Sequence, residues 1–253
     1  MTELLRREPC PVCREMGRDH KGDNLAVYDD GHSYCYGCGT VFPTSKGSVV
    51  ERKDRMSLGL IDSGEFVPLT KRGITQKTCT FYGYSKSHYN GRPVQVAPYH
   101  DSKGELVAQH IRFPDKKFIW TGDAGKAALF GQHLFRDGGK QVVVTEGEID
   151  CLTVAQLWEC KWPVVSIPSG AQHAKKALAQ NLEWLEKFDK VILLFDNDEP
   201  GRKAAHEAAL VLSPGKAYIA TTPLKDANEM LLADRTKELI DSIWSARVFR
   251  PEV

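Results

Sequence analysis

Two groups of residues in this chain have the types and the spacing that chemistry at metal ions requires. The first group is a pair of CxxC motifs, Cys10–Cys13 and Cys35–Cys38, with 21 residues between them. Each CxxC turn presents two thiolates to a tetrahedral zinc ion, and the gap is close to that of zinc ribbons. The sequence therefore predicts one structural zinc site, with the ligands Cys10, Cys13, Cys35 and Cys38.

The second group consists of carboxylates that follow apolar runs. Glu146 and Asp150 stand one helical turn apart after one run, so both can face the same side. Asp196 and Asp198 form a DxD motif after another run, and Asp226 is a further candidate. Such carboxylates hold Mg²⁺ or Mn²⁺, which in nucleotidyl transfer lower the pKa of the attacking 3′-hydroxyl and neutralise developing charge. The alternative for each single acid is a helix N-cap, which is common after strands.

The elements that must position these acids alternate between strands and helices. Apolar runs predict strands at 141–145, 163–167, 190–195 and 217–221. Helical spacing predicts helices at 150–158, 174–188 and 200–212. This alternation favours a parallel sheet, in which functional residues gather at the carboxyl ends of the strands. Glu146, Ser169, Asp196 and Asp226 each follow a strand, so we expect them at one edge of the sheet.

Four parts of the chain are expected from these patterns. They are a zinc-binding module at 1–43, a flexible linker at 44–63, a basic α+β subdomain at 64–138 and a catalytic α/β subdomain at 139–253. The zinc module is too small for a sufficient hydrophobic core, so bound metal is expected to supply its folding energy. Within the α+β subdomain the patterns predict a helix at 75–82, strands at 94–99 and 105–113, and a hairpin turn at 101–104.

The net charge of +1 is unevenly distributed. Residues 63–138 carry 11 Lys and Arg against 6 Asp and Glu, a balance of +5, whereas residues 139–253 carry 14 against 17, a balance of −3. We expect the phosphate-binding surface in the middle of the chain and the metal-binding acids in its last third. Ordinary variation of surface charge is the alternative explanation.

Composition narrows the class of protein further. Of the 253 residues 42% are hydrophobic, yet no apolar run approaches the roughly 18–20 residues that span a bilayer. The first residues lack the apolar core of a secretory signal. Seven cysteines without an export signal favour a reducing compartment in which thiols bind metal. We therefore expect a cytoplasmic protein without a membrane partner.

Taken together, the motifs resemble those of a known family. Glu146–Asp150 with Asp196–Asp198 resembles the Toprim domain of bacterial-type primases, topoisomerases, OLD nucleases and the RecR repair protein. The fuller runs at 142–154, 194–204 and 225–229 are similar to the primase branch. With the four-cysteine module and its Asp-Gly-His-Ser-Tyr-Cys run, the chain resembles the primase half of the bifunctional primase–helicase of short-tailed bacteriophages, over about residues 8–245.

The resemblance implies a fold class and an activity. The fold would be α/β, with a Toprim domain built on a Rossmann-like parallel sheet, an α+β N-terminal subdomain and a preceding zinc-ribbon β domain. The activity would be that of a DNA primase, a nucleotidyltransferase that makes short RNA primers for lagging-strand replication. The implied partners are single-stranded DNA, ribonucleoside triphosphates, a replicative helicase (fused or separate) and a DNA polymerase. The implied cofactors are one structural Zn²⁺ and two catalytic Mg²⁺ or Mn²⁺ ions, in the cytoplasm of a bacterial host.

The resemblance also implies roles for the acids. Glu146 would be the catalytic acid, either as a metal ligand or as the general base toward the 3′-hydroxyl. Asp196 and Asp198 would hold the catalytic metals. Asp150 and Asp226 would support them.

The template and nucleotide contacts follow from the same resemblance. Asp30 and His32 would help the zinc module to recognise a short template trinucleotide, and a surface histidine without a role is the alternative for His32. Arg112, Lys116 and Lys117 would bind nucleotide and template, and a solvated basic hairpin is the alternative for that stretch. This chain has His110 where the family can carry a lysine.

Two other functions stay open at this point. A Toprim nuclease resembling the OLD type would cut DNA with the same metals, and a module resembling the RecR repair protein would bind DNA without catalysis. The zinc module and the Lys-Asp-Ala-Asn-Glu run disfavour the nuclease, and the long basic insert before the Toprim region disfavours the repair module. The chain has no GxxxxGK[ST] phosphate loop, so it is interpreted either as a fragment of a primase–helicase or as a helicase-free primase.

Overall fold

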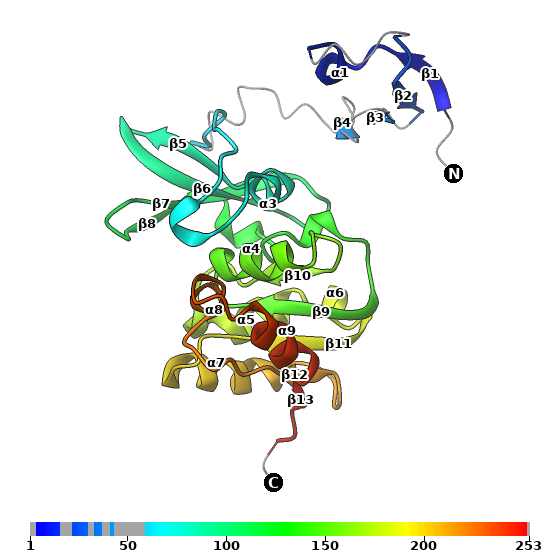
Figure 1. Cartoon of the computed structure of the whole chain (residues 1–253). Helices are drawn as coiled ribbons and strands as arrows, with labels where there is room; N and C mark the ends of the chain where they lie inside the picture. The colour runs from blue at the N-terminus through cyan, green and yellow to red at the C-terminus, as the bar shows by residue number, and fades with distance from the viewer. Residues whose placement is uncertain (1–3, 16–21, 30–32, 37–40, 43–58, 252–253) are drawn as a thin grey trace. The chain divides into compact units, whose positions relative to one another are not determined.

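The computed structural model describes residues 4–15, 22–29, 33–36, 41–42 and 59–251. The chain divides into two compact units, Met1–Ser57 and Leu58–Val253 (Figure 1). The predicted zinc module falls in the first unit, and the two predicted subdomains at 64–138 and 139–253 fall in the second. Most of the expected linker at 44–63 lies outside the described residues, and the four domain boundaries stay predictions.

The first unit is a small antiparallel sheet with one short helix. Its strands lie in chain order: β1 (Leu4–Glu8), β2 (Leu25–Tyr28), β3 (Ser33–Cys35) and β4 (Val41–Phe42). Helix α1 (Pro11–Glu15) follows β1 and contains the second cysteine of the first CxxC motif. Among the described residues of this unit, the buried cluster consists of Leu25 with Cys10, Cys13 and Cys35. A cluster in which thiols predominate agrees with the expectation that metal stabilises this part of the chain.

The second unit begins with α+β structure. Helix α3 (Gln76–Tyr82) is capped by the Thr75 side chain, and four antiparallel strands follow in the order β5 (Ser85–Tyr89), β6 (Arg92–His100), β7 (Leu106–Arg112) and β8 (Phe118–Gly122). The Asp101 side chain accepts hydrogen bonds from the backbone N–H groups of Lys103 and Glu105, which closes the turn between β6 and β7. The predicted helix at 75–82 and hairpin turn at 101–104 are confirmed.

A second sheet carries the rest of the unit. Its strand order is β10 (Val164–Ser166), β9 (Gly139–Thr145), β11 (Phe188–Leu194), β12 (Ala217–Ile219) and β13 (Arg247–Val248). The pairs β10–β9, β9–β11 and β11–β12 are parallel, and β13 alone pairs antiparallel. The predicted parallel α/β arrangement is confirmed.

Helices cover both faces of this parallel sheet, because its strands are apolar on both sides. Alternate residues of one strand belong to different cores: Val143 packs with helix α4 (Glu148–Leu157), whereas Val142 and Val144 pack with α5 (Ala174–Gln180) and α7 (Glu199–Ala209). Helices α8 (Ala227–Leu232) and α9 (Thr236–Trp244) lie on the α4 side, as Figure 1 shows. Burial on both faces is typical of parallel sheets in α/β proteins.

One predicted helix is wrong in its extent. The spacing predicts a single helix at 174–188, but the structure divides it into α5 and α6 (Leu182–Leu185), and Phe188 begins strand β11. The break falls at Asn181, whose side-chain amide donates to the Ala177 carbonyl and whose backbone leaves the helical region. Local side-chain to backbone bonds of this kind compete with a continuing helix.

The two sheets of the second unit share one core. The Tyr82 hydroxyl donates to the Val164 carbonyl at 2.8 Å, and the Tyr82 ring stacks on Phe130 with 5.4 Å between centroids. The Asn228 side chain, on α8, donates to the carbonyl of Arg72 near the start of the unit. These contacts fix α3 and the start of the unit against the parallel sheet and α8, and the Tyr99 ring of β6 packs on Phe130 at 5.5 Å between centroids. The cleft described below is built between the two sheets.

Candidate active site

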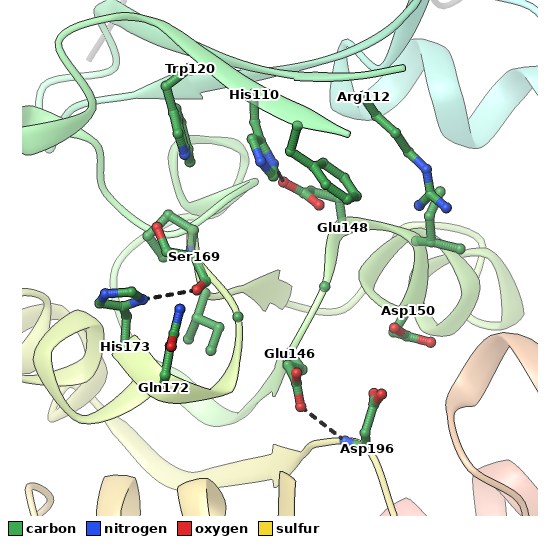
Figure 2. Close-up of a pocket in the computed structure, with 16 residues that line it drawn as sticks. His110, Arg112, Trp120, Glu146, Glu148, Asp150, Ser169, Gln172, His173 and Asp196 are labelled. Carbon is green, nitrogen blue, oxygen red and sulfur yellow. Dashed lines mark hydrogen bonds and ion pairs between the residues drawn. The ribbon is translucent and has the colours of Figure 1, made fainter. Parts of the chain in front are cut away.

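Glu146 stands immediately after β9, at the carboxyl edge of the parallel sheet. Its carboxylate accepts hydrogen bonds from the backbone N–H groups of Ala171 (3.3 Å) and Asp196 (3.4 Å), each of which follows a different strand. Figure 2 shows the bond to Asp196. Burial raises the pKa of Glu146 above its ordinary value, and these two hydrogen bonds oppose the rise. The acid is thereby fixed in place by the loops that follow β10 and β11.

The DxD motif follows the next strand of the sheet. Asp196 comes directly after the β11 run, and Asp198 caps helix α7 by accepting from the Gly201 N–H at 2.9 Å. A side chain at Gly201 would meet the Asp196 carbonyl oxygen at 2.2 Å, so the loop closes tightly over this glycine. Asp198 is therefore a helix N-cap, which is the alternative given above for each single acid. It nevertheless lies at the same edge of the parallel sheet as Glu146.

Asp150 and Asp226 complete the acidic edge. Asp226 caps helix α8 by accepting from the Glu229 N–H at 2.7 Å. Asp150, in the first turn of α4, accepts from the Asn228 N–H at 3.1 Å, and it lines the same cleft as Glu146 and Asp196. Gly147 at the start of α4 is extended (φ −131°), so the entry into that helix does not depend on a left-handed glycine.

The carboxylates of the acidic edge repel one another, and this repulsion adds to burial in raising the pKa values of Asp150 and Asp196. Burial, then Asp226 and Asp196, raise the pKa of Asp150 to about 8. Burial, then Glu146 and Asp226, raise the pKa of Asp196 to about 6. Divalent cations relieve this kind of repulsion between carboxylates, and carboxylate oxygens are the donors that Mg²⁺ and Mn²⁺ prefer. The donor set therefore fits a divalent metal of this type.

A basic and aromatic wall faces this acidic edge. Strands β7 and β8 contribute His110, Arg112, Phe118 and Trp120 to the lining of the cleft (Figure 2). The His110 ring stacks between Trp120 (4.6 Å) and Phe118 (5.0 Å), and the Arg112 guanidinium lies over the Phe118 ring at 5.3 Å. The register of the hairpin places His110 opposite Trp120 and Arg112 opposite Phe118. A row of planar groups with a cation at its end suits phosphates and bases.

Glu148, at the start of α4, connects the acidic edge to the basic and aromatic wall. His110 Nδ1 donates to Glu148 Oε1 at 2.6 Å, and the Tyr99 hydroxyl donates to the same oxygen at 2.8 Å. Burial alone would raise the pKa of Glu148, but the bonds from His110 and Tyr99 outweigh it and hold that pKa below the ordinary value. Glu148 lies within the sequence motif, but the sequence gives no signal for its role, because its partners stand 38 and 49 residues away on another sheet.

The loop after β10 forms the third wall of the cleft. Ser169, Gly170, Gln172 and His173 line it, and the cavity has a volume of about 600 Å³. His173 Nδ1 lies 3.1 Å from the Ser169 carbonyl oxygen, which holds the loop in a turn. The expected approach of Ser169 to Glu146 and Asp196 is confirmed, since all three line this cleft. Gln172 and His173 were not singled out from the sequence, which offers no periodic or charge signal at them.

The predicted basic residues separate into two groups. Arg112 lines the cleft, whereas Lys116 and Lys117 stand in the turn between β7 and β8. Lys116 has a left-handed backbone (φ 64°), and the largely exposed Lys117 lies 3.6 Å from the Asp115 carboxylate. Of the three, only Arg112 is among the residues that surround the cavity.

The cysteines form a separate site in the first unit. The sulfur atoms of Cys10, Cys13 and Cys35 all lie within 4.8 Å of one another, and all three residues are buried. Within the described ranges, no other group of three or more His, Cys, Asp or Glu brings its ligand atoms so close. Three clustered thiols fit a soft tetrahedral metal site. The fourth predicted ligand, Cys38, and the predicted template contacts Asp30 and His32 lie outside the described residues.

Family models match both halves of the second unit. A model described as the N-terminal a+b fold of the bacteriophage T7 DNA helicase/primase matches residues 64–122, and a Toprim-like model matches residues 143–231. The sheet with its acidic edge is thus that of the Toprim class, joined to a primase-type α+β subdomain.

Similarity to individual proteins assigns the chain to one family within this class. The chain is 40% identical to the DNA helicase/primase of Enterobacteria phage T3, over 98% of this chain and 45% of that protein. It is also 40% identical to the crystal structure of the primase fragment of the bacteriophage T7 primase-helicase protein, covering 96% of this chain and all of the fragment, with a TM-score of 0.68. The chain belongs to the family of these phage primases.

Three further findings accompany this assignment. The chain spans less than half the length of its phage T3 relative. The zinc-binding and RNA polymerase domains of the Aquifex aeolicus primase share the fold, with 18% identity and a TM-score of 0.62. In the part of the chain that the structure describes, no helix has the length and apolar character needed to cross a bilayer.

Proposed function

We propose that the chain is a DNA primase, which synthesises short RNA primers on single-stranded DNA by metal-dependent nucleotidyl transfer. The observation that carries this proposal is the cleft itself. Strand-end acids of a Toprim sheet face a basic and aromatic hairpin wall across a cavity of about 600 Å³, which lies within the usual range for small-molecule sites. The relatives support the reaction: one solved structure has T7 primase domains bound to an RNA/DNA hybrid and interacting with the lagging-strand DNA polymerase.

In this reaction the 3′-hydroxyl of one ribonucleotide attacks the α-phosphorus of the next, and pyrophosphate leaves. Glu146 is suited to accept the hydroxyl proton, because burial raises its pKa while two backbone N–H groups fix its orientation. Asp196 and Asp198 would hold the catalytic ions, with Asp150 and Asp226 in support. Bound Mg²⁺ or Mn²⁺ supplies charge neutralisation at the phosphates.

The hairpin wall would hold the nucleotide and the template. Arg112 lies at the end of the aromatic row and can pair with a phosphate while bases approach the rings. His110 occupies the middle of that row, where Glu148 and Tyr99 fix its orientation. Lys116 and Lys117 extend the positive surface beyond the cleft and would contact the template backbone.

The first unit would select the template. Cys10, Cys13 and Cys35, together with Cys38, would bind one structural Zn²⁺, and Asp30 and His32 would contact the template trinucleotide. We further propose the domain boundaries given above, a replicative helicase and a DNA polymerase as partners, and the cytoplasm of a phage-infected bacterium as the location. The helicase partner is either fused or separate, since the chain matches less than half of its T3 relative.

The test is oligoribonucleotide synthesis with labelled CTP and ATP, Mg²⁺ or Mn²⁺, and single-stranded templates of varied trinucleotide content. Short template-dependent RNA is expected, and it should be lost in Asp196→Asn while single-stranded DNA binding stays nearly intact. Because Asn keeps the size of the side chain, this variant removes charge without opening a cavity. Template cleavage instead of RNA synthesis would favour the nuclease, and DNA binding without either reaction would favour a non-catalytic module.

A further inference from the structure

A lysine ammonium lies between the two carboxylates of the DxD motif. Lys225 Nζ is 3.5 Å from Asp196 Oδ2 and 3.7 Å from Asp198 Oδ2. In the described part of the chain, no other Lys or Arg side chain lies within 4.0 Å of either carboxylate. Opposite charges at this distance attract one another more strongly where water is partly excluded, and the Asp196 side chain is only 21% exposed.

The backbone fixes Lys225 beside the motif, whereas its side chain is half exposed. The Asn197 N–H donates to the Lys225 carbonyl at 2.6 Å, and the Asn197 side-chain amide donates to the Thr222 carbonyl at 2.8 Å. The loop that carries the lysine is therefore joined to the loop that carries the acids. The Lys225 side chain is 52% exposed, so its long stem can swing the ammonium into solvent without disturbing the loop.

Arg202, a cation close to the motif in sequence, is engaged elsewhere. Its guanidinium donates to the carbonyl and side-chain oxygens of Asn197 at 3.1 and 3.0 Å. It therefore supports the loop and leaves the facing carboxylate oxygens of Asp196 and Asp198 to Lys225.

We propose that Lys225 is an internal counter-ion of the DxD motif, which a divalent metal must displace in order to bind Asp196 and Asp198. This inference rests on the proposed function, because it assigns these two acids to the metal. A positive charge among the ligands both blocks their oxygens and repels the incoming ion. It follows that Lys225 lowers the affinity of the site for metal, and that the metal releases the ammonium.

The first experiment measures Mn²⁺ binding to the full chain by electron paramagnetic resonance at about pH 8, where Asp196 is ionised, since its pKa is about 6. Zinc is supplied beforehand so that the cysteines are occupied. The Lys225→Met variant keeps the apolar stem without the charge, and we expect it to bind Mn²⁺ roughly tenfold more tightly than the wild type. The control Lys203→Met removes one charge from the exposed face of α7 and should bind as the wild type does.

Unchanged or weaker Mn²⁺ binding by Lys225→Met would overturn the inference. The variant Asp198→Asn separates this result from a failure of the proposed function. If Asp198→Asn binds Mn²⁺ as the wild type does, the metal is not at the DxD motif and the assignment of the acids fails. If Asp198→Asn loses binding while Lys225→Met shows no gain, only the counter-ion inference fails.

A second experiment measures displacement directly. Lysines of the wild type are acetylated briefly with and without Mg²⁺, and mass spectrometry follows Lys225 and Lys203. An ammonium held by two carboxylates reacts slowly, so Mg²⁺ is expected to speed modification of Lys225 several-fold and to leave Lys203 unchanged. The same rate at Lys225 with and without saturating Mg²⁺ would show that the metal does not release the ammonium.

Discussion

The cysteine cluster and the acidic edge are both suited to metals, but they are built in opposite ways. In the first unit, three of the four buried cluster residues are themselves the thiol donors, within 4.8 Å of one another. In the second unit, the carboxylates stand at the end of a sheet whose two faces are packed by extensive apolar cores. Among the described residues of the first unit, thiols make up most of this buried cluster, whereas the acids of the second unit stand beside apolar cores that they do not form.

This difference predicts what each metal does for the protein. Metal at the cysteines should contribute directly to folding, as in small zinc modules. Metal at the acidic edge should relieve repulsion among acids that the fold already holds together, as the raised pKa values of Asp150 and Asp196 indicate. The predictions below test this contrast, and all five tryptophans lie in the second unit, so their fluorescence reports on that unit alone.

The largest expected effect is the response of the two units to loss of zinc. We expect Cys35→Ser to abolish binding of about one zinc ion per chain and to stop initiation on template, because one of the four ligands is removed. The tryptophan unfolding curve should not change, since the second unit has its own core. The control Cys160→Ser, in the second unit, should keep zinc and lower the unfolding temperature. If both units unfolded in one transition, and zinc chelation shifted that transition, the proposed difference between the two units would be wrong.

The next prediction concerns the backbone that presents the DxD motif. Alanine at position 201 favours the helix by propensity, but its Cβ would approach the Asp196 carbonyl oxygen to 2.2 Å. We expect Gly201→Ala to displace the loop and to lower primer synthesis by about 100-fold, because small displacements of reacting groups are costly. Lys203→Ala, which puts alanine on the exposed face of the same helix, is the control. Wild-type synthesis by Gly201→Ala would show that the position of this loop does not limit catalysis.

A third prediction measures the repulsion at the acidic edge. The pKa of Asp150 rises from 3.8 to about 8 on folding, so between these values the folded chain retains a proton that the unfolded chain has lost. Stability should therefore fall as pH rises from about 4 to about 8. We expect Asp150→Asn, which can still accept from the Asn228 N–H, to remove this slope and to raise the free energy of unfolding by roughly 2–4 kcal/mol at about pH 8.

The measurement is urea unfolding of the second unit, followed by tryptophan fluorescence in EDTA at about pH 5 and about pH 8. Asp241→Asn, at an exposed position on α9, is the matched control. Mg²⁺ should restore part of the wild-type stability at the higher pH, since it binds the ionised acids. Parallel pH curves for Asp150→Asn and the wild type would show that burial at this position costs the fold nothing.

The sequence was sufficient to predict the acidic edge. Strand ends are set by local patterns, and parallel strands bring their carboxyl ends to one side, so Glu146, Asp150 and Asp196 could be placed together before any coordinates. The alternation of strands and helices along the sequence likewise predicted the parallel sheet. The error at 174–188 arose because a single residue, Asn181, ends a helix whose apolar spacing continues across it.

The opposite wall could not be predicted in the same way. The row of Trp120, His110 and Phe118 depends on the register between β7 and β8, and the pairing of His110 with Glu148 depends on how one sheet packs on another. Neither relation leaves a periodic signal in the sequence. Net charge predicted that this segment is the phosphate-binding surface, which stays a prediction, and it gave equal weight to every lysine and arginine in the segment.

The smallest expected effects separate these basic residues. Lys117 is 77% exposed and lies beside Asp115, so its charge is already partly compensated and screened by salt. We expect Lys117→Ala to change template affinity less than about twofold, and Arg112→Ala to weaken nucleotide binding by about tenfold, because Arg112 lines the cleft opposite the acids. Fluorescence anisotropy with labelled template and labelled nucleotide measures both. If the two variants lost equal affinity, long-range charge rather than the aromatic row would determine binding at this wall. Arg112 would then have no specific role opposite the acidic edge of the cleft.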